Sequence, residues 1–170
     1  MKIMIIGTSG SGKSTLAQTL GQRYGVPVLH LDAVHFLPGW VERTPEEETA
    51  LVEQFLDRNR QGGWVIDGNY TKTCYERRLA EADRILVLWF NRFVCLERVT
   101  RRWWKNRGRT RSSMAEGCAE KLDTEFIWWV LYRGRRKGFR QGIGRIVQQY
   151  PQKVVLMHNQ REVNRFLARV

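Results

Sequence analysis

The sequence feature that most constrains the fold is GTSGSGKS at residues 7–14, which follows a short apolar run and precedes a helical pattern. It fits G-x-x-x-x-G-K-[ST] at every fixed position. Glycines in such a loop let several backbone N–H groups point into one concavity at the start of a helix, where they can bind an anion. The glycine spacing differs from the G-x-G-x-x-G of dinucleotide-binding domains. We therefore predict a phosphate-binding loop between a strand and a helix.

The side chains of this loop predict its ligands. Lys13 can reach the β- and γ-phosphates of a nucleotide, and the Ser14 hydroxyl can complete the coordination shell of Mg²⁺. A nucleoside triphosphate and Mg²⁺ are therefore the expected ligands. The residues expected to bind the nucleotide here are Gly7, Thr8, Ser9, Gly10, Ser11, Gly12, Lys13, Ser14 and Thr15.

Length and composition indicate one domain over residues 1–170. With 42% hydrophobic residues, the chain can bury a sizeable core. No apolar run approaches the ~20 residues of a membrane span, and no signal peptide precedes the first apolar run. Cys74, Cys95 and Cys118 show no C-x-x-C pairing. We therefore expect a cytoplasmic protein with reduced thiols and no membrane partner.

The net charge of +12 is concentrated in the second half of the chain. Residues 1–84 carry 10 Lys and Arg against 11 Asp and Glu, a net charge of −1, whereas residues 85–170 carry 19 against 6, a net charge of +13. The second half is therefore expected to bind an acidic partner. Nucleotides, nucleic acids and membrane surfaces all meet this description.

Short apolar runs alternate with helical patterns along the whole chain, which predicts a parallel sheet covered by helices on both faces. Thr44-Pro45 followed by three glutamates is a strong helix start. A long basic helical region follows at about 92–150, interrupted by a polar segment near 108–120. We expect strands at 3–6, 26–31, 64–66, 85–90 and 154–157, and further helices at 14–24, 45–58 and 160–168.

Two aspartates follow predicted strands. Ligands of open α/β sheets bind at the carboxyl ends of the strands. Asp32 is therefore placed to take a proton from a substrate hydroxyl or to hold a metal-bound water, although aspartates after strands are also common in turns and helix caps. Asp67 ends an apolar strand and is expected to hold Mg²⁺ together with Ser14. Because Asp-Gly also marks ordinary turns, this assignment depends on the phosphate loop upstream.

The stretch RVTRRWWKNRGRTR at 98–111 contains seven Lys and Arg and no acidic residue. One helical face of it can close over a triphosphate, follow a nucleic-acid backbone, or simply be solvated. A second basic cluster, which includes Arg133, lies beyond the polar segment. Two arginine-bearing helices around such a segment are more typical of a lid than of a flat DNA-binding patch. The residues that share the first face are Arg98, Arg101, Arg102 and Lys105.

Five stretches together resemble the bacterial DNA topology modulation proteins, a group similar to adenylate kinase among the P-loop nucleoside and nucleotide kinases. They are GTSGSGKST, LDAVHFLPGW, WVIDGNY, ADRILVLWF and MAEGCAEKLDTEFIWWV, and they span essentially the whole chain. The resemblance implies an α/β, three-layer P-loop fold with a five-stranded parallel sheet of order 2-3-1-4-5 and a helical lid within 92–150. It also implies that Arg98 binds the nucleotide and that Arg102 and Arg133 supply charge from the lid.

The sequence departs from adenylate kinase directly after Asp67-Gly68. Residues 69–71 read N-Y-T instead of F-P-R. The arginine that helps bind the acceptor nucleotide in adenylate kinase is therefore absent, which argues against AMP as the acceptor.

The leading hypothesis is an ATP-dependent phosphotransferase that acts on a small hydroxyl- or phosphate-bearing acceptor by in-line transfer. One alternative is a nucleotide-binding regulator of DNA topology or transcription that binds nucleic acid through the basic half, although no helix-turn-helix is present. A domain with slow ATPase activity alone is another. The residues expected to be catalytic are Lys13, Asp32, Arg102 and Arg133.

Overall fold

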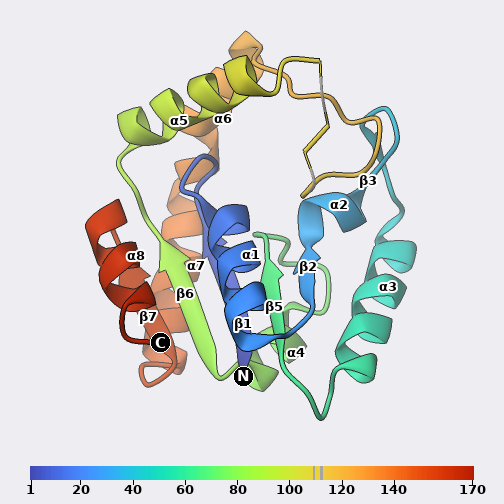
Figure 1. Cartoon of the computed structure of the whole chain (residues 1–170), viewed down its shortest axis with the longest axis vertical. Coiled ribbons are helices and arrows are strands. Elements are labelled where there is room, and N and C mark those ends of the chain that lie inside the picture. Colours follow the sequence, from blue (N-terminus) through green and yellow to red (C-terminus); the bar gives the residue numbers. More distant parts are fainter. Residues whose placement is uncertain (109, 112) are drawn as a thin grey trace.

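The computed structural model describes residues 1–108, 110–111 and 113–170 (Figure 1). Its central sheet has five parallel strands in the order β2-β5-β1-β6-β7. Counted within this sheet alone, the order is 2-3-1-4-5, so the predicted α/β fold is confirmed. The strands are β1 (Lys2–Gly7), β2 (Val28–His30), β5 (Trp64–Asp67), β6 (Arg84–Leu88) and β7 (Val154–Met157).

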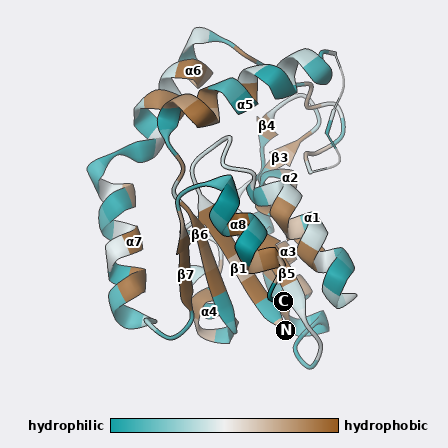
Figure 2. Ribbon diagram, turned by 60° about the vertical axis from the view of Figure 1, so that its left-hand side comes forward, coloured by the Kyte–Doolittle hydropathy of each residue, from teal (hydrophilic) through white to brown (hydrophobic). Residues whose placement is uncertain are grey.

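Helices cover both faces of this apolar sheet (Figures 1 and 2). Alternate side chains of β1 enter different cores, since Ile3 and Ile5 pack with α1 and α8, whereas Met4 packs with α3, α4 and α7. In the described residues, no helix is both long and apolar enough to cross a membrane. The helices are α1 (Lys13–Tyr24), α2 (Leu31–His35), α3 (Pro45–Arg58), α4 (Tyr75–Glu81), α5 (Arg92–Lys105), α6 (Thr124–Leu131), η1 (Arg133–Arg135), α7 (Lys137–Gln149) and α8 (Gln160–Leu167).

Helix α3 begins and ends where the sequence predicts, at Pro45 and Arg58. The Thr44 side chain accepts a hydrogen bond from the Glu47 N–H at 3.3 Å, and the Glu47 carboxylate accepts one from the Thr44 N–H at 3.3 Å. This capping box satisfies two backbone donors that the helix itself leaves unpaired. The start of α3 is therefore specified locally.

The sequence pattern does not predict the helices α2 and α4. It also does not predict an antiparallel hairpin of β3 (Phe36–Leu37) and β4 (Val41–Glu42). The hairpin turn contains Gly39 at φ +81° and Trp40 at φ +68°. Strands of two residues are too short to show an alternating pattern, which explains why the hairpin is missed.

The basic region at 92–150 folds as α5, α6, η1 and α7, with a connection of residues 106–123 between α5 and α6. The predicted interruption at 108–120 lies inside this connection. Helices α5 and α6 lie across one end of the sheet (Figure 1). Arg109, which belongs to the predicted basic run, and Ser112 lie outside the described residues.

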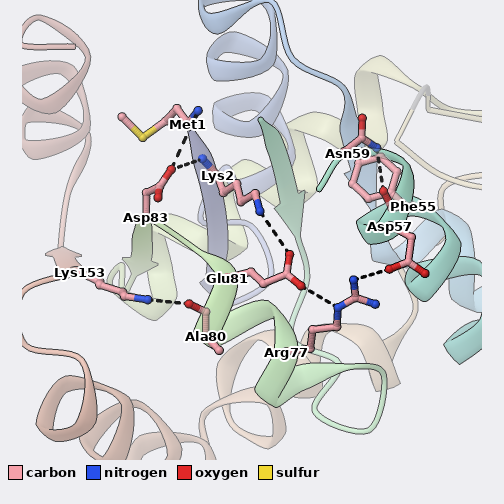
Figure 3. Close-up of polar contacts among 10 residues, drawn as sticks. All are labelled: Met1, Lys2, Phe55, Asp57, Asn59, Arg77, Ala80, Glu81, Asp83 and Lys153. Carbon is pink, nitrogen blue, oxygen red and sulfur yellow. Dashed lines mark hydrogen bonds and ion pairs between the residues drawn. The ribbon is translucent and has the colours of Figure 1, made fainter. Parts of the chain in front are cut away.

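Polar contacts join the elements at the amino-terminal ends of the strands (Figure 3). The Lys2 N–H donates to Asp83 at 2.6 Å, and the Lys2 ammonium lies 3.4 Å from Glu81. Arg77 bonds Glu81 at 2.7 Å and Asp57 at 2.5 Å, which links α4 to α3. The predicted site residues lie at the opposite, carboxyl edge of the sheet.

Candidate active site

The loop of residues 7–14 connects β1 to α1 and has a backbone that only glycine readily adopts. Gly10 has φ +79°, and a Cβ there would lie 2.5 Å from the backbone oxygen of Cys95. Gly12 has φ +94° and is the N-cap of α1, without a side-chain cap. Any larger residue at these positions would be strained or would collide. With no acidic residue in the first turn of α1, its free N–H groups can bind an anion.

The Lys13 ammonium is buried against this loop. Its Nζ donates to the backbone oxygen of Thr8 at 3.2 Å. Burial lowers the pKa of Lys13, while the negative charges of Asp32 and Asp67 oppose that shift. The predicted lysine and both predicted aspartates are therefore electrostatically coupled in one site.

Ser14 and Asp67 meet across the ends of α1 and β5. The Ser14 hydroxyl donates to Asp67 Oδ2 at 2.8 Å, and Asp67 Oδ1 bonds His30 Nδ1. His30 and Asp67 are register partners in the adjacent strands β2 and β5. The sequence analysis did not identify His30 as a site residue, because only the strand pairing reveals this contact.

The Ser14–Asp67 pair suits Mg²⁺. A serine hydroxyl and a carboxylate are hard oxygen ligands, and Mg²⁺ typically binds one or two carboxylates together with waters and substrate phosphates. Among the described residues, no group of three or more His, Cys, Asp or Glu side chains could hold a metal by itself. The donor set therefore fits a magnesium ion that is bound together with a nucleotide.

Asp32 lies in the first turn of α2, directly after β2. The Tyr70 hydroxyl donates to Asp32 Oδ1 at 2.9 Å. Asn69, from the same segment after β5, accepts a bond from the Gly7 N–H at 2.9 Å and donates to the Gly7 carbonyl at 2.6 Å. The N-Y departure from adenylate kinase thus orients Asp32 and holds the phosphate loop, two roles that the sequence analysis did not foresee.

A histidine and a buried carboxylate lie behind Tyr70. His35 Nδ1 is 2.6 Å from Glu48 Oε1, and Glu48 also accepts a hydrogen bond from the Thr73 hydroxyl at 3.1 Å. The His35 and Tyr70 rings are 4.8 Å apart. Because these residues come from α2, α3 and the segment after β5, tertiary packing alone brings them together.

Arg98 and Arg102 of α5 both turn toward the site. Arg98 Nη1 donates to the Ser11 carbonyl of the phosphate loop at 3.3 Å, and its guanidinium lies over the Phe90 ring. Arg102 lies 3.1 Å from Glu120, and burial lowers its pKa while the charge of Asp32 opposes that shift. The same buried Glu120 carboxylate also pairs with Arg111.

Arg133 and Arg135 differ although both belong to η1. Arg133 is half-exposed and lies 3.4 Å from Glu125. Arg135 is buried, donates to the Phe90 carbonyl at 2.7 Å and contacts the Thr8 hydroxyl at 3.2 Å. The structure therefore brings Arg135 to the phosphate loop, while Arg133, which is predicted to supply charge from the lid, pairs with Glu125.

The other predicted loop residues differ in exposure. Ser11 is buried, and its hydroxyl has no hydrogen-bond partner among the described residues. Thr8 is also buried, with its hydroxyl 3.5 Å from Cys95 Sγ. The Thr15 side chain is exposed and Ser9 is half-buried. Of these predicted nucleotide-binding residues, Thr8 and Ser11 are therefore buried, whereas Thr15 is exposed to solvent.

Residues 113–121 of the connection between α5 and α6 dock on the β3–β4 hairpin. Cys118 Sγ donates to the Leu37 carbonyl at 3.4 Å, and Trp40 Nε1 donates to the Ala119 carbonyl at 3.2 Å. The Lys121 ammonium lies 5.2 Å from the centre of the Trp40 ring. The LDAVHFLPGW and MAEGCAEKLDTEFIWWV stretches of the sequence are therefore in direct contact.

Comparison with known proteins identifies the family. A family model described as an AAA domain matches residues 3–119, and no curated protein matches the chain. A gluconokinase from Sinorhizobium meliloti 1021 is 18% identical with a TM-score of 0.50, over 99% of this chain and 91% of that chain. An uncharacterized protein from Eubacterium ventriosum ATCC 27560 is 14% identical with a TM-score of 0.53, over 99% of this chain and 97% of that chain.

At these identities the two solved structures show the fold alone. The family match covers more than half of the chain, including the phosphate loop, Asp32 and Asp67. With the geometry above, it identifies a nucleotide-binding protein of the kinase type. The chain belongs to the AAA-domain family and, through it, to the superfamily of P-loop nucleoside and nucleotide kinases.

Proposed function

We propose that the protein is an ATP-dependent phosphotransferase that acts on a small hydroxyl- or phosphate-bearing acceptor. The observation that carries this proposal is the convergence of three elements: the phosphate loop with Lys13, the Ser14–Asp67 pair, and Asp32 held by Tyr70. A nucleotide-binding switch needs the first two elements. A carboxylate positioned by its own hydrogen bond beside them supports chemistry on a second substrate.

The phosphate side would bind and orient ATP. The loop N–H groups and the N-terminus of α1 bind phosphate oxygens, and Lys13 neutralises their charge. Arg98, Arg102 and Arg135 add positive charge from the second half of the chain. Ser14 and Asp67 would hold Mg²⁺, which would neutralise phosphate charge when bound.

Asp32 would act on the acceptor. When the acceptor hydroxyl attacks, its oxygen forms a bond to the γ-phosphorus, and the bond from that phosphorus to the β–γ bridging oxygen breaks, releasing ADP. The hydroxyl proton passes to Asp32. Tyr70 bonds only Oδ1, which leaves Oδ2 to accept this proton. The likeness to a gluconokinase supports a kinase reaction by fold-level analogy.

The nucleic-acid alternative rests on the basic second half, which carries a net charge of +13. In the structure, Arg98 and Arg135 of this half contact the phosphate loop, and Arg101 is paired with Glu97 at 2.7 Å. These contacts favour a nucleotide as the acidic ligand.

The test measures ADP release from ATP with Mg²⁺ in the presence of nucleosides, nucleotides, sugars and hydroxy acids. We expect at least one class to raise ADP release above the acceptor-free rate, with loss of this increase in Lys13→Ala. Lys153→Ala, a lysine at the opposite, amino-terminal edge of the sheet, is the matched control (Figure 3). ATP hydrolysis that no compound increases would indicate an ATPase instead.

A further inference from the structure

Carboxylates gather around the Tyr70 hydroxyl, whereas Lys13, Arg98 and Arg135 contact the phosphate loop. Burial raises the pKa of the Tyr70 hydroxyl, and nearby carboxylates raise it further because they disfavour a second negative charge. Those carboxylates are Asp32, Glu48 and Glu42. Tyr70 therefore stays protonated, and a further anion placed beside it would meet the same repulsion.

Nearby cations on this side are engaged elsewhere. Arg78 is fully buried beneath Tyr70 and donates to the carbonyls of Thr73, at 3.0 Å, and Tyr70. Arg43 Nε donates to the Val34 carbonyl at 2.9 Å. Arg78 is therefore enclosed by the protein, although its Nη1 has no hydrogen-bond partner among the described residues, and Arg43 is tied to the backbone through its Nε.

Four further groups lie around this side, and two of them, Lys13 and Arg102, act electrostatically on Asp32. His35 lies between two carboxylates, 2.6 Å from Glu48 and 3.7 Å from Glu42. Lys121 lies over Trp40, at the contact between the hairpin and residues 113–121. Arg102 is shared with the buried Glu120 carboxylate. The carboxylates around Tyr70 are therefore compensated only in part.

A row of neighbouring aromatic rings connects Tyr70 with the β3–β4 hairpin. The His35 ring lies 4.8 Å from Tyr70 and 4.5 Å from Phe36, and Phe36 lies 5.1 Å from Trp40. All four residues are half-buried. Aromatic rings pack against the C–H faces of a ligand, and carboxylates accept hydrogen bonds from its hydroxyl or amino groups.

We propose that the acceptor is a polyhydroxylated molecule, neutral or amino-bearing, without a phosphate or carboxylate group. This inference rests on the proposed phosphotransferase function and specifies its second substrate. The acceptor lies against the rings of His35, Phe36, Trp40 and Tyr70. One of its hydroxyls gives its proton to Asp32 as the oxygen–phosphorus bond forms and ADP leaves.

The experiment compares acceptors that differ in charge on one skeleton. Glucose is compared with glucosamine, gluconate and glucose 6-phosphate, and adenosine with AMP, by the specificity constant for ADP release at saturating ATP and Mg²⁺. We expect a neutral or amino member to exceed its anionic counterparts by about tenfold, because an unpaired charge beside a carboxylate cluster is unfavourable. If no such member exceeds its anionic counterpart, the proposed acceptor class is wrong.

Charge-neutral variants test whether the carboxylates cause this selection. Glu42→Gln removes a mostly exposed carboxylate that lies 3.7 Å from His35, so this variant is expected to fold. It should raise the ratio of anionic to neutral specificity constants by about twofold to fivefold. Glu48→Gln should act in the same direction. Glu97→Gln, on the outer face of α5, is the control and should leave the ratio unchanged.

Two outcomes separate this inference from the proposed function. A preference for anionic acceptors, or an unchanged ratio in both Glu42→Gln and Glu48→Gln, would overturn the acceptor class and leave the kinase function standing. Absence of ATP-dependent thermal stabilisation in the unmodified protein would overturn the proposed function itself. The stabilisation assay is therefore run on the same samples.

Discussion

The two sides of the candidate site differ in their charged residues and are assembled differently. The phosphate side combines a contiguous loop, residues 7–14, with arginines from the basic half of the chain. The Asp32 side combines short segments after β2 and β5 with one residue of α3. One side is thus specified mainly by a continuous motif, and the other mainly by tertiary contacts.

This contrast has a chemical meaning. A triphosphate donor needs positive charge and backbone N–H groups, which the phosphate side concentrates. An acceptor hydroxyl needs a base, and a carboxylate serves as a base only where cations do not fully engage it. The proposed phosphotransferase function assigns the donor to the first side and the acceptor hydroxyl to the second.

The largest expected effect comes from removing the central cation of the phosphate side. Lys13→Ala should abolish the thermal stabilisation by ATP and leave the fold intact, because the ammonium is the point charge within the phosphate loop. Stabilisation of the unmodified protein at a hundredfold excess of ATP over its Kd would be about 2.7 kcal/mol. Thermal unfolding with and without ATP measures it, and undiminished stabilisation of the variant would contradict the assignment of the loop.

The next largest effect should separate the two aspartates. Asp32→Asn should lower phosphoryl transfer by about 10²-fold or more while ATP binding is retained, as expected for the loss of a general base. Asp67→Asn should instead weaken nucleotide binding that depends on Mg²⁺. Steady-state kinetics and nucleotide titrations at several Mg²⁺ concentrations measure both. An Asp32→Asn enzyme with normal turnover would remove Asp32 from the mechanism.

A smaller effect should distinguish the two arginines of η1. Arg135→Ala removes buried hydrogen bonds to Phe90 and Thr8, and should lower the free energy of unfolding by about 1.5–3 kcal/mol. Arg133→Ala removes a half-exposed ion pair and should change it by about 0.5 kcal/mol or less. Urea unfolding of both variants measures the difference. If both variants lose the same free energy of unfolding, the buried contacts of Arg135 do not stabilise the protein more than the ion pair of Arg133.

The smallest effect concerns the contact between the hairpin and residues 113–121. Trp40→Phe removes the hydrogen bond to the Ala119 carbonyl, which is worth about 1 kcal/mol, so cleavage between Gly108 and Gly117 should be about fivefold faster. Mg²⁺ and ATP together with an acceptor should slow that cleavage if this segment acts as a lid. Limited proteolysis measures both rates. Trp104→Phe, at an exposed position of α5, is the control, and equal rates in the two variants would exclude a role for this contact.

The sequence by itself determined the phosphate loop, the alternation of strands and helices, and the positions of Asp32 and Asp67. These features depend on residues that are close together in the chain. The glycines specify a backbone that other residues cannot adopt, and the Thr44–Glu47 capping box starts α3. Aspartates at strand ends reach the same edge of a parallel sheet wherever the strands pair.

Only the tertiary structure decided which of several similar side chains reach the site. His30 contacts Asp67 because β2 and β5 pair in register, across 37 positions of sequence. Arg135 reaches Thr8 across 127 positions, while Arg133 of the same basic cluster pairs with Glu125. Because the two arginines are only two positions apart, the composition and periodicity of the surrounding sequence do not distinguish them. The direction of a side chain over such distances depends on how whole elements pack, and a local pattern carries no information about that packing.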